Sequence, residues 1–480
     1  MPSLSKISFK LLRIVSYLVL VMLAVFVTLS LLLVFYVSPR LDQWREPIQE
    51  VVQKHTGMPV EFGGLELSWR GFNPQLIVKD ISFQESELPT PTKRLPRASI
   101  KDLRLSLQPS LTFWKDGLIG VELAHAQLPV LIDPEGDVWV GQHRLPLVDV
   151  SFNEFPDAKG HELNEVSFIA ALSNYLTQDF GEQIDLLRED KLFSLLRRLS
   201  VEDVLLSIRD ASNLPTGAFL SESEQQAQEP RGVIYDFTLN VKKATTTISE
   251  GQIKSDVLLR SEALSANDIM IDNLIDYTHQ DERGGSKPSG YLKVSSRFIE
   301  PRQLFADALD KLAIDKVVVE AFDFFSQLDD GHWQAFKADL LLGDFSMPHA
   351  VAKRISLSAE GEVADVLATL FDYGHQHNPL QFTVEINDGW LYEPLNFRHD
   401  FALAHVELQG SYELDDANLP VLSVRKLAVN DPNIKLNAHG KWHAVPTTES
   451  GHIQLEGEIH HLVASYLPRF VPKLIDARAL

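Results

Sequence analysis

Apolar and polar residues alternate with a period of two along most of the chain after residue 60. This alternation gives a strand one apolar and one polar face, which is typical of an antiparallel sheet with one face in water. The chain is therefore predicted to be mainly β, with one long, curled antiparallel sheet. The clearest alternating groups are Leu103, Leu105 and Leu107, then Phe237, Leu239 and Val241, and then Phe382, Val384 and Ile386.

Turn-forming residues separate the alternating runs at Asp133–Gly136, Asp329–Gly331, Asn387–Gly389 and Asn430–Asn433. We expect about 20 strands, which at roughly 4.8 Å per strand would extend on the order of 100 Å. Helical residues are too few to cover the apolar face of such a sheet. That face must either line an apolar groove, for which the three alternating groups are the candidate lining, or be sealed in a two-sheet sandwich.

Helical patterns are limited to two places in this β-rich part. Residues 172–199 carry apolar residues at helical spacing, and residues 299–314 begin with Pro301, which suits a first turn. A polar loop at 222–231 divides the chain into a first β segment, 58–221, with the helical insertion at about 172–199, and a continuing β segment, 232–480.

A run without charged residues, from Ile14 to Val37, precedes the β-rich part. At 1.5 Å per residue these 24 residues would span about 36 Å, enough to cross a bilayer. Basic residues precede the run, so residues 1–13 are expected in the cytoplasm and the rest outside. A cleaved signal peptide is the alternative, but its apolar region would be shorter and end in small residues. Arg13, Tyr36 and Trp44 are predicted to lie at the membrane interface, and residues 38–57 to hold a short amphipathic helix.

Composition excludes several classes of function. The formal net charge is -22, which disfavours nucleic acid as a partner, and cysteine is absent, which removes disulfides and thiolate metal sites. No nucleophile elbow, phosphate-binding loop, dinucleotide fingerprint or zinc-protease motif is present. His375, His377, His460 and His461 are the best metal-ligand candidates, but no clear site surrounds them. We therefore expect no enzyme activity, cofactor or metal.

The segment Leu41–Phe83 carries a family resemblance. It reads LDQWREPIQEVVQKHTGMPVEFGGLELSWRGFNPQLIVKDISF and follows a single N-terminal anchor. This order of elements resembles the start of AsmA-like proteins, particularly the YhdP type. Such chains are much longer, so this one is expected to be an N-terminal part or a short member of the family.

The resemblance implies a protein anchored in the inner membrane of a Gram-negative bacterium, with its bulk in the periplasm. It implies a bridge-like lipid transfer fold, in which phospholipid acyl chains lie on an apolar β-groove between the inner and outer membranes. A short member would need a partner protein or self-association to complete the bridge. The alternative is a non-transport scaffold or outer-membrane assembly factor with a sealed β-sandwich core.

Overall fold

The computed structural model describes most of the β-rich part of the chain and separate positions near the N-terminus. The described residues are 60–70, 73–83, 97–107, 118–132, 138–140, 143–144, 180–189, 194–210, 235–249, 251–261, 267–280, 285–299, 301, 309, 313–363, 365, 378–391, 401–415, 419–444 and 451–466, with positions 17, 21, 27, 28, 31, 35, 36, 38–47, 49 and 50.

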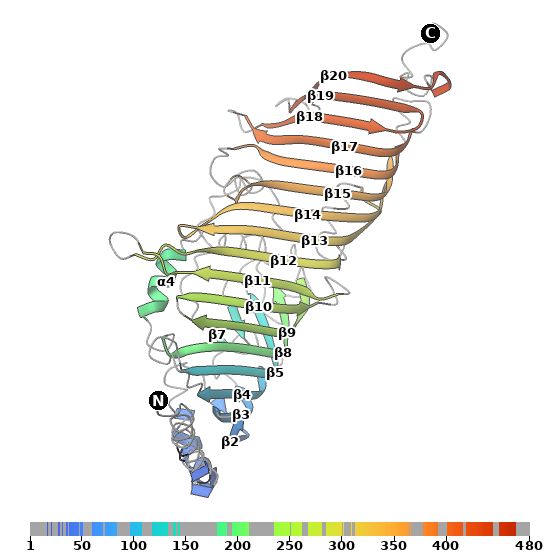
Figure 1. Cartoon of the computed structure of the whole chain (residues 1–480). Helices are drawn as coiled ribbons and strands as arrows, with labels where there is room; N and C mark the ends of the chain where they lie inside the picture. Colours follow the sequence, from blue (N-terminus) through green and yellow to red (C-terminus); the bar gives the residue numbers. More distant parts are fainter. Residues whose placement is uncertain are drawn as a thin grey trace, which may run out of the picture.

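These residues form one 20-stranded sheet, which rises from β2 beside the N-terminus to β20 beside the C-terminus (Figure 1). The prediction of a mainly β chain with a long sheet is confirmed. The strands are β1 (Val60–Glu61), β2 (Gly64–Arg70), β3 (Asn73–Phe83), β4 (Ser99–Leu107), β5 (Ile119–Ile132), β6 (Val138–Val140), β7 (His143–Arg144), β8 (Leu196–Asp210), β9 (Tyr235–Ser249), β10 (Gln252–Arg260), β11 (Ile269–Asp276), β12 (Ser289–Ile299), β13 (Lys316–Asp329), β14 (His332–Met347), β15 (Ala350–Glu362), β16 (Leu380–Leu391), β17 (Phe401–Leu414), β18 (Pro420–Asn430), β19 (Ile434–Ala444) and β20 (Gly451–Leu462).

From β8 to β20 each strand pairs antiparallel with the next strand in the sequence. The sheet departs from the predicted antiparallel order at one place, where β5 and β8 pair in parallel. A parallel neighbour requires the chain to cross back before it pairs. Here the crossing segment contains β6, β7 and the helix α4 (Phe180–Glu189), and β6 pairs with the last residues of β5. The sheet is continuous across the polar loop at 222–231, because β8 and β9 pair from Arg198 and Thr247 to Asp210 and Tyr235.

In the described part of the chain, the helical elements with defined bounds are η2 (Ser38–Trp44), α4 and η5 (Ala464–Tyr466). The predicted helical insertion contains α4, but its last residues, Leu196–Leu199, belong to β8. Of the predicted helix at 299–314, Ile299 ends β12, and only Pro301 and Leu309 among the central residues are described. No helix among the described positions is long and apolar enough to cross a membrane. Most of the predicted span 14–37 lies outside the described residues.

The predicted turns have different outcomes. Asp329–Gly331 joins β13 to β14, with φ values of 52° at Asp330 and 85° at Gly331, and Asn430–Asn433 joins β18 to β19, so both predictions are confirmed. Asp133–Gly136 lies outside the described residues, although Ile132 and Val138 on either side of it pair as a hairpin would. The turn predicted at Asn387–Gly389 is wrong, because these residues lie inside β16.

Candidate functional site: the apolar face of the sheet

The strand register aligns apolar side chains into rows that cross many strands. One row contains only aliphatic residues and runs over every strand from β12 to β20. Its members, each paired with the next, are Ile299, Val319, Leu342, Ile355, Ile386, Val406, Val429, Leu436 and Ile459. Because side chains alternate between faces, this row lies on one side of the sheet, which we call the inner face.

The register also places the three predicted groups on this inner face. Leu103 of β4 is connected to Phe382 of β16 by paired residues in every intervening strand. The steps are Leu123, Val201, Ala244, Val257, Ile271, Val294, Phe324, Ala338 and Ala359. Leu105, Leu107, Leu239, Val241, Val384 and Ile386 share this face by alternation. Phe237 occupies the matching position of β9, opposite Ile208, and its side chain is outside the described residues.

One part of the inner face is covered. Helix α4 packs Phe180 and Ile184 against β11 to β14, where Leu328 is 1% exposed and Trp333 is 4% exposed. The rings of Phe180 and Trp333 meet edge to face with their centroids 5.7 Å apart. Figure 1 shows α4 at one margin of the sheet, so it covers the ends of these strands and not their full length.

The other end of the inner face is uncovered in the described part of the chain. On β20, Ile453 is 61% exposed, Leu455 48% and Ile459 61%. Phe382, Val384 and Ile386 are partly exposed, and Leu107 is exposed, whereas Val241 is buried. The ring of Phe382 lies over Gly410, where an added Cβ would come within 2.7 Å of its Cζ atom. The inner face therefore presents a partly exposed apolar surface over several neighbouring strands.

Strands β3, β5, β8, β12, β14 and β16 each contain one non-glycine residue in the left-handed region of φ. We call these positions together the crease. These residues, with φ between 46° and 55°, are Asp80, His125, Asp203, Phe298, Asp344 and Asp388. At the crease the spacing of inner-face residues is three instead of two, as from Val78 to Ile81 and from Leu342 to Phe345. Two consecutive side chains then point to the other face, and both are exposed at Glu202–Asp203 and at Arg297–Phe298. Such irregularities bend strands, so the crease contributes to the curvature of the sheet.

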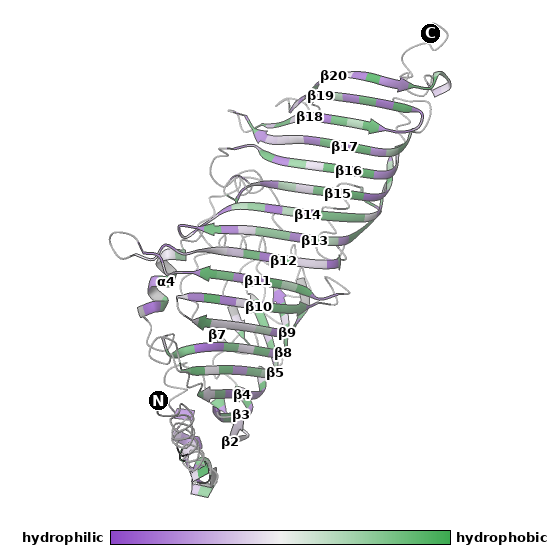
Figure 2. Ribbon diagram, viewed as in Figure 1, coloured by the Kyte–Doolittle hydropathy of each residue, from purple (hydrophilic) through white to green (hydrophobic). Residues whose placement is uncertain are grey.

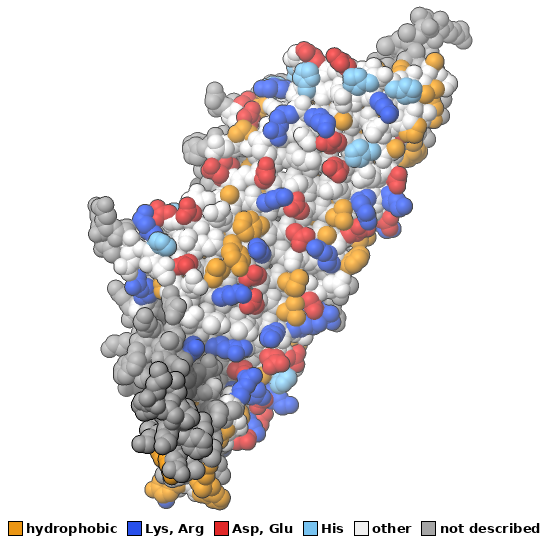
Figure 3. Space-filling model, in the orientation of Figure 1, with side chains coloured by type: hydrophobic (Ala, Val, Ile, Leu, Met, Phe, Trp, Pro, Cys, Tyr) orange, Lys and Arg blue, Asp and Glu red, His pale blue; other side chains and the backbone are white. Residues whose placement is uncertain are grey.

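The opposite, outer face carries charged side chains over its whole length (Figure 3), and the alternation of hydrophobic and hydrophilic residues along each strand is visible in Figure 2. Ion pairs cross neighbouring strands there, such as Arg297–Asp323 at 3.0 Å and Lys426–Glu407 at 2.6 Å. The hydrogen bond from Lys426 lowers the pKa of Glu407, and the hydrogen bond from Lys242 lowers the pKa of Asp268. The outer face is therefore rich in paired charges, although Met270, Phe298 and Phe325 are also exposed on it.

The predicted membrane-interface residues are only partly described. Arg13 lies outside the described residues. Tyr36 and Trp44 are both well exposed, and the guanidinium carbon of Arg40 lies 3.8 Å from the centre of the Tyr36 ring. The helix η2, which ends at Trp44, lies beside β2. The interface role of Arg13, Tyr36 and Trp44 stays a prediction.

The metal-ligand candidates do not form a site in the described residues, where no group of three His, Asp or Glu side chains could hold a metal ion. His460 and His461 lie on β20, and Nε2 of His460 is 3.0 Å from Nδ2 of Asn437. His375 and His377 lie outside the described residues. The expectation of a protein without a metal stays a prediction.

The comparison with protein families concerns the N-terminal part of the chain. The family model described as YhdP protein matches residues 1–118. The N-terminal region is YhdP-like. This confirms the resemblance over that region, which includes the predicted anchor, η2 and strands β1 to β4. The YhdP match ends before β5, so most of the uncovered inner face lies beyond it. A search of curated proteins gives no match for this sequence.

Proposed function

We propose that this protein carries phospholipid along the inner face of its sheet, from an anchor in the bacterial inner membrane toward the outer membrane. The row of aliphatic residues from Ile299 to Ile459 is the observation that carries the proposal. Acyl chains on this row would stay out of water while headgroups remain hydrated at its edge. Such transport requires no catalytic residue, so we propose a carrier and not an enzyme.

The YhdP-like N-terminal region supports an envelope location, with the charge-free run at 14–37 as a single-pass anchor and the sheet in the periplasm. In this arrangement Arg13, Tyr36 and Trp44 lie near the membrane surface. The uncovered apolar end at β20 supports a partner protein or a second copy that continues the path. The scaffold alternative expects a second sheet sealing the apolar face, whereas all described strands belong to one sheet.

Lipid capture in living cells tests the proposal. A photo-crosslinking amino acid is placed at Val384, which lies between Leu357 and Leu408 on the inner face, or at its neighbour Glu385, which is exposed on the outer face. Both variants change the same strand, so expression and folding are closely matched. Phospholipid crosslinks at Val384 and not at Glu385 would support the carrier. Absence of lipid at Val384, and also at Leu239 and Ile386, would refute it and favour the scaffold.

A further inference from the structure

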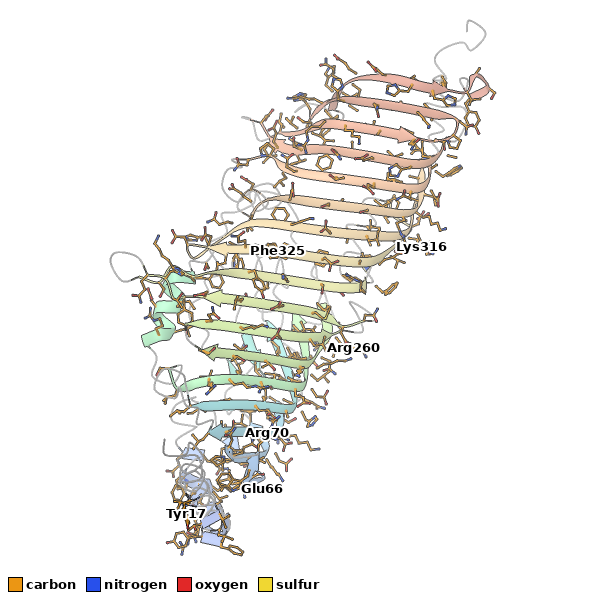
Figure 4. All side chains as sticks on the ribbon, viewed as in Figure 1. Tyr17, Glu66, Arg70, Arg260, Lys316 and Phe325 are labelled. Carbon is orange, nitrogen blue, oxygen red and sulfur yellow. The ribbon has the colours of Figure 1, made fainter. Side chains whose placement is uncertain are left out.

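A small polar hollow lies on the outer face in the membrane-proximal part of the sheet. Its volume is about 210 Å³, and Arg70, Asn73, Gln75, Ser106, Gly120, Val121, Glu122, Arg198 and Ser200 line it. It sits across β2 to β5 and β8, on the side of the sheet opposite the proposed lipid path. Figure 4 labels Arg70 at this level of the sheet.

Small residues create the hollow. Ser106 of β4 pairs with Gly120 of β5, and Gly120 in turn pairs with Arg198 of β8. Gly120 has no side chain, and the hydroxyl of Ser106 donates to the Gly120 carbonyl at 3.2 Å. No long side chain from these two positions therefore fills the space above the sheet. Gln75, Ser106 and Ser200 are all buried polar residues. The bottom of the hollow is therefore formed by small or polar residues, and the longer charged side chains of Arg70, Glu122 and Arg198 line its sides.

Among the described residues, Arg198 is the arginine lining the hollow for which no ion pair with a carboxylate is present. Glu122 accepts from Arg70 at 2.9 Å and from Arg104 at 2.6 Å, and Arg104 also lies 3.4 Å from Asp102. Both nearby carboxylates are thus engaged by the other two arginines. The Nε atom of Arg198 is buried and has no hydrogen-bond partner in the described part of the chain. A buried donor of this kind is costly unless something accepts from it.

We infer that the hollow binds a phosphate ester, with Arg198 as the principal cation and Arg70 at the rim. A guanidinium presents a planar fork of donors that matches phosphate oxygens, and the Asn73 and Gln75 amides offer further donors. The helix η2, which follows the predicted anchor, lies beside β2, the strand that supplies Arg70. The phosphate ester could belong to a lipid headgroup at the membrane surface or to a soluble molecule.

The test uses the full chain with two phosphate sources. Protein in dodecyl maltoside micelles, which contain no phosphate, is titrated with glycerol 3-phosphate by calorimetry. Protein in phosphatidylglycerol nanodiscs is then compared with the micelle sample for modification of Arg198 by phenylglyoxal. Arg209, on the same strand and the same face but outside the hollow, is the internal reference for modification. The variants are Arg198→Gln, Arg198→Lys and the matched control Arg209→Gln, each checked for its strand content by circular dichroism.

We expect Arg198→Gln to weaken binding of glycerol 3-phosphate by about tenfold or more, since a charged hydrogen bond is lost, and Arg209→Gln to leave it unchanged. Arg198→Lys should retain part of the affinity. Protection of Arg198 by nanodiscs without binding of glycerol 3-phosphate would identify a lipid headgroup as the ligand. Binding of glycerol 3-phosphate without protection by nanodiscs would identify a soluble ester. The inference would be overturned if Arg198→Gln and Arg209→Gln both bound glycerol 3-phosphate with the affinity of the native protein, or if the native protein showed neither binding of glycerol 3-phosphate nor protection of Arg198 by nanodiscs.

Discussion

The inner face has two regions with the same alternating pattern and different surroundings. Near α4, Leu328 and Trp333 are buried in a cluster with Phe180 and Ile184. At β20, Ile453, Leu455 and Ile459 occupy the same side of the sheet and remain largely exposed. Apolar side chains therefore stabilise the fold only where another element removes them from water. Where nothing described covers them, they form a contiguous apolar surface, and such surfaces mark interaction sites.

The largest expected effect is a difference in the free energy of unfolding between a substitution in the covered region and one in the uncovered region. Trp333→Ala removes a buried ring that contacts Phe180, so we expect a loss of about 3–5 kcal/mol in the free energy of unfolding. Trp442→Ala is the matched change in the uncovered region, where Trp442 lies on β19 opposite Ile453 and is partly exposed. We expect it to cost markedly less. Urea denaturation of both variants measures the difference, and equal losses would mean that the far region is also packed.

A second prediction concerns the amount of bound phospholipid and compares a charge on the inner face with the same charge on the outer face. Ile355→Glu places a charge within the aliphatic row, between Leu342 and Ile386, and should reduce copurified phospholipid several-fold because a carboxylate interrupts the apolar path. Ser356→Glu adds the same charge to the next residue on the outer face and should leave the lipid unchanged. Mass spectrometry of lipids extracted from the two purified proteins compares them. Equal lipid content would contradict the assignment of the inner face as the path.

The face of each strand could be predicted from the sequence, because alternation is a local property. Leu103, Val241 and Phe382 share a face as that pattern requires. The crease could not be predicted in the same way, because Asn387-Asp388-Gly389 has the composition of a hairpin turn and yet continues β16 with Asp388 in the left-handed region.

Two other features depend on contacts between distant residues. The apolar residues from Leu187 to Leu199 fit helical spacing, but pairing with β5 and β9 makes Leu196–Leu199 part of a strand. The contact between Phe180 and Trp333 joins positions far apart in the chain, and amphipathic character alone does not say where α4 packs. The hollow at Arg198 also escapes sequence reasoning, since its residues come from separate strands.

The crease offers a smaller effect in the uncovered region. Asp388 has a φ of 52°, which a β-branched side chain tolerates poorly, so Asp388→Val should lower the free energy of unfolding by about 1–3 kcal/mol. Asp388→Gly should cost little or stabilise, because glycine adopts this conformation freely. Thr383→Val, in the same strand and on the same face but with ordinary strand geometry, serves as the control. If Asp388→Val and Thr383→Val had equal unfolding midpoints in urea, the crease would not be a strained feature.

The smallest expected effect concerns how α4 is held in the covered region. Asp185 accepts hydrogen bonds from the Ser286 hydroxyl at 2.6 Å and from the Ser286 backbone N–H at 3.1 Å, and these bonds lower the pKa of Asp185. A carboxyl pKa that is lower in the folded than in the unfolded state, where it is about 3.9, means that the unfolded state binds the proton more tightly. The resulting stabilisation is present at neutral pH and is lost as the pH falls through the unfolded and then the folded pKa.

Asp185→Asn should therefore be slightly less stable than the native protein at neutral pH and should approach it in acid. Asp256→Asn, an exposed outer-face change beside Lys254, should leave the difference between neutral and acid stability close to that of the native protein. Urea midpoints of the three proteins between neutral pH and about pH 3 measure this, the lower limit lying just below the ordinary carboxyl pKa. A pH dependence unaltered by Asp185→Asn would show that the Asp185–Ser286 contact does not hold α4 on the sheet, and the cover over Leu328 and Trp333 would then depend on apolar packing alone.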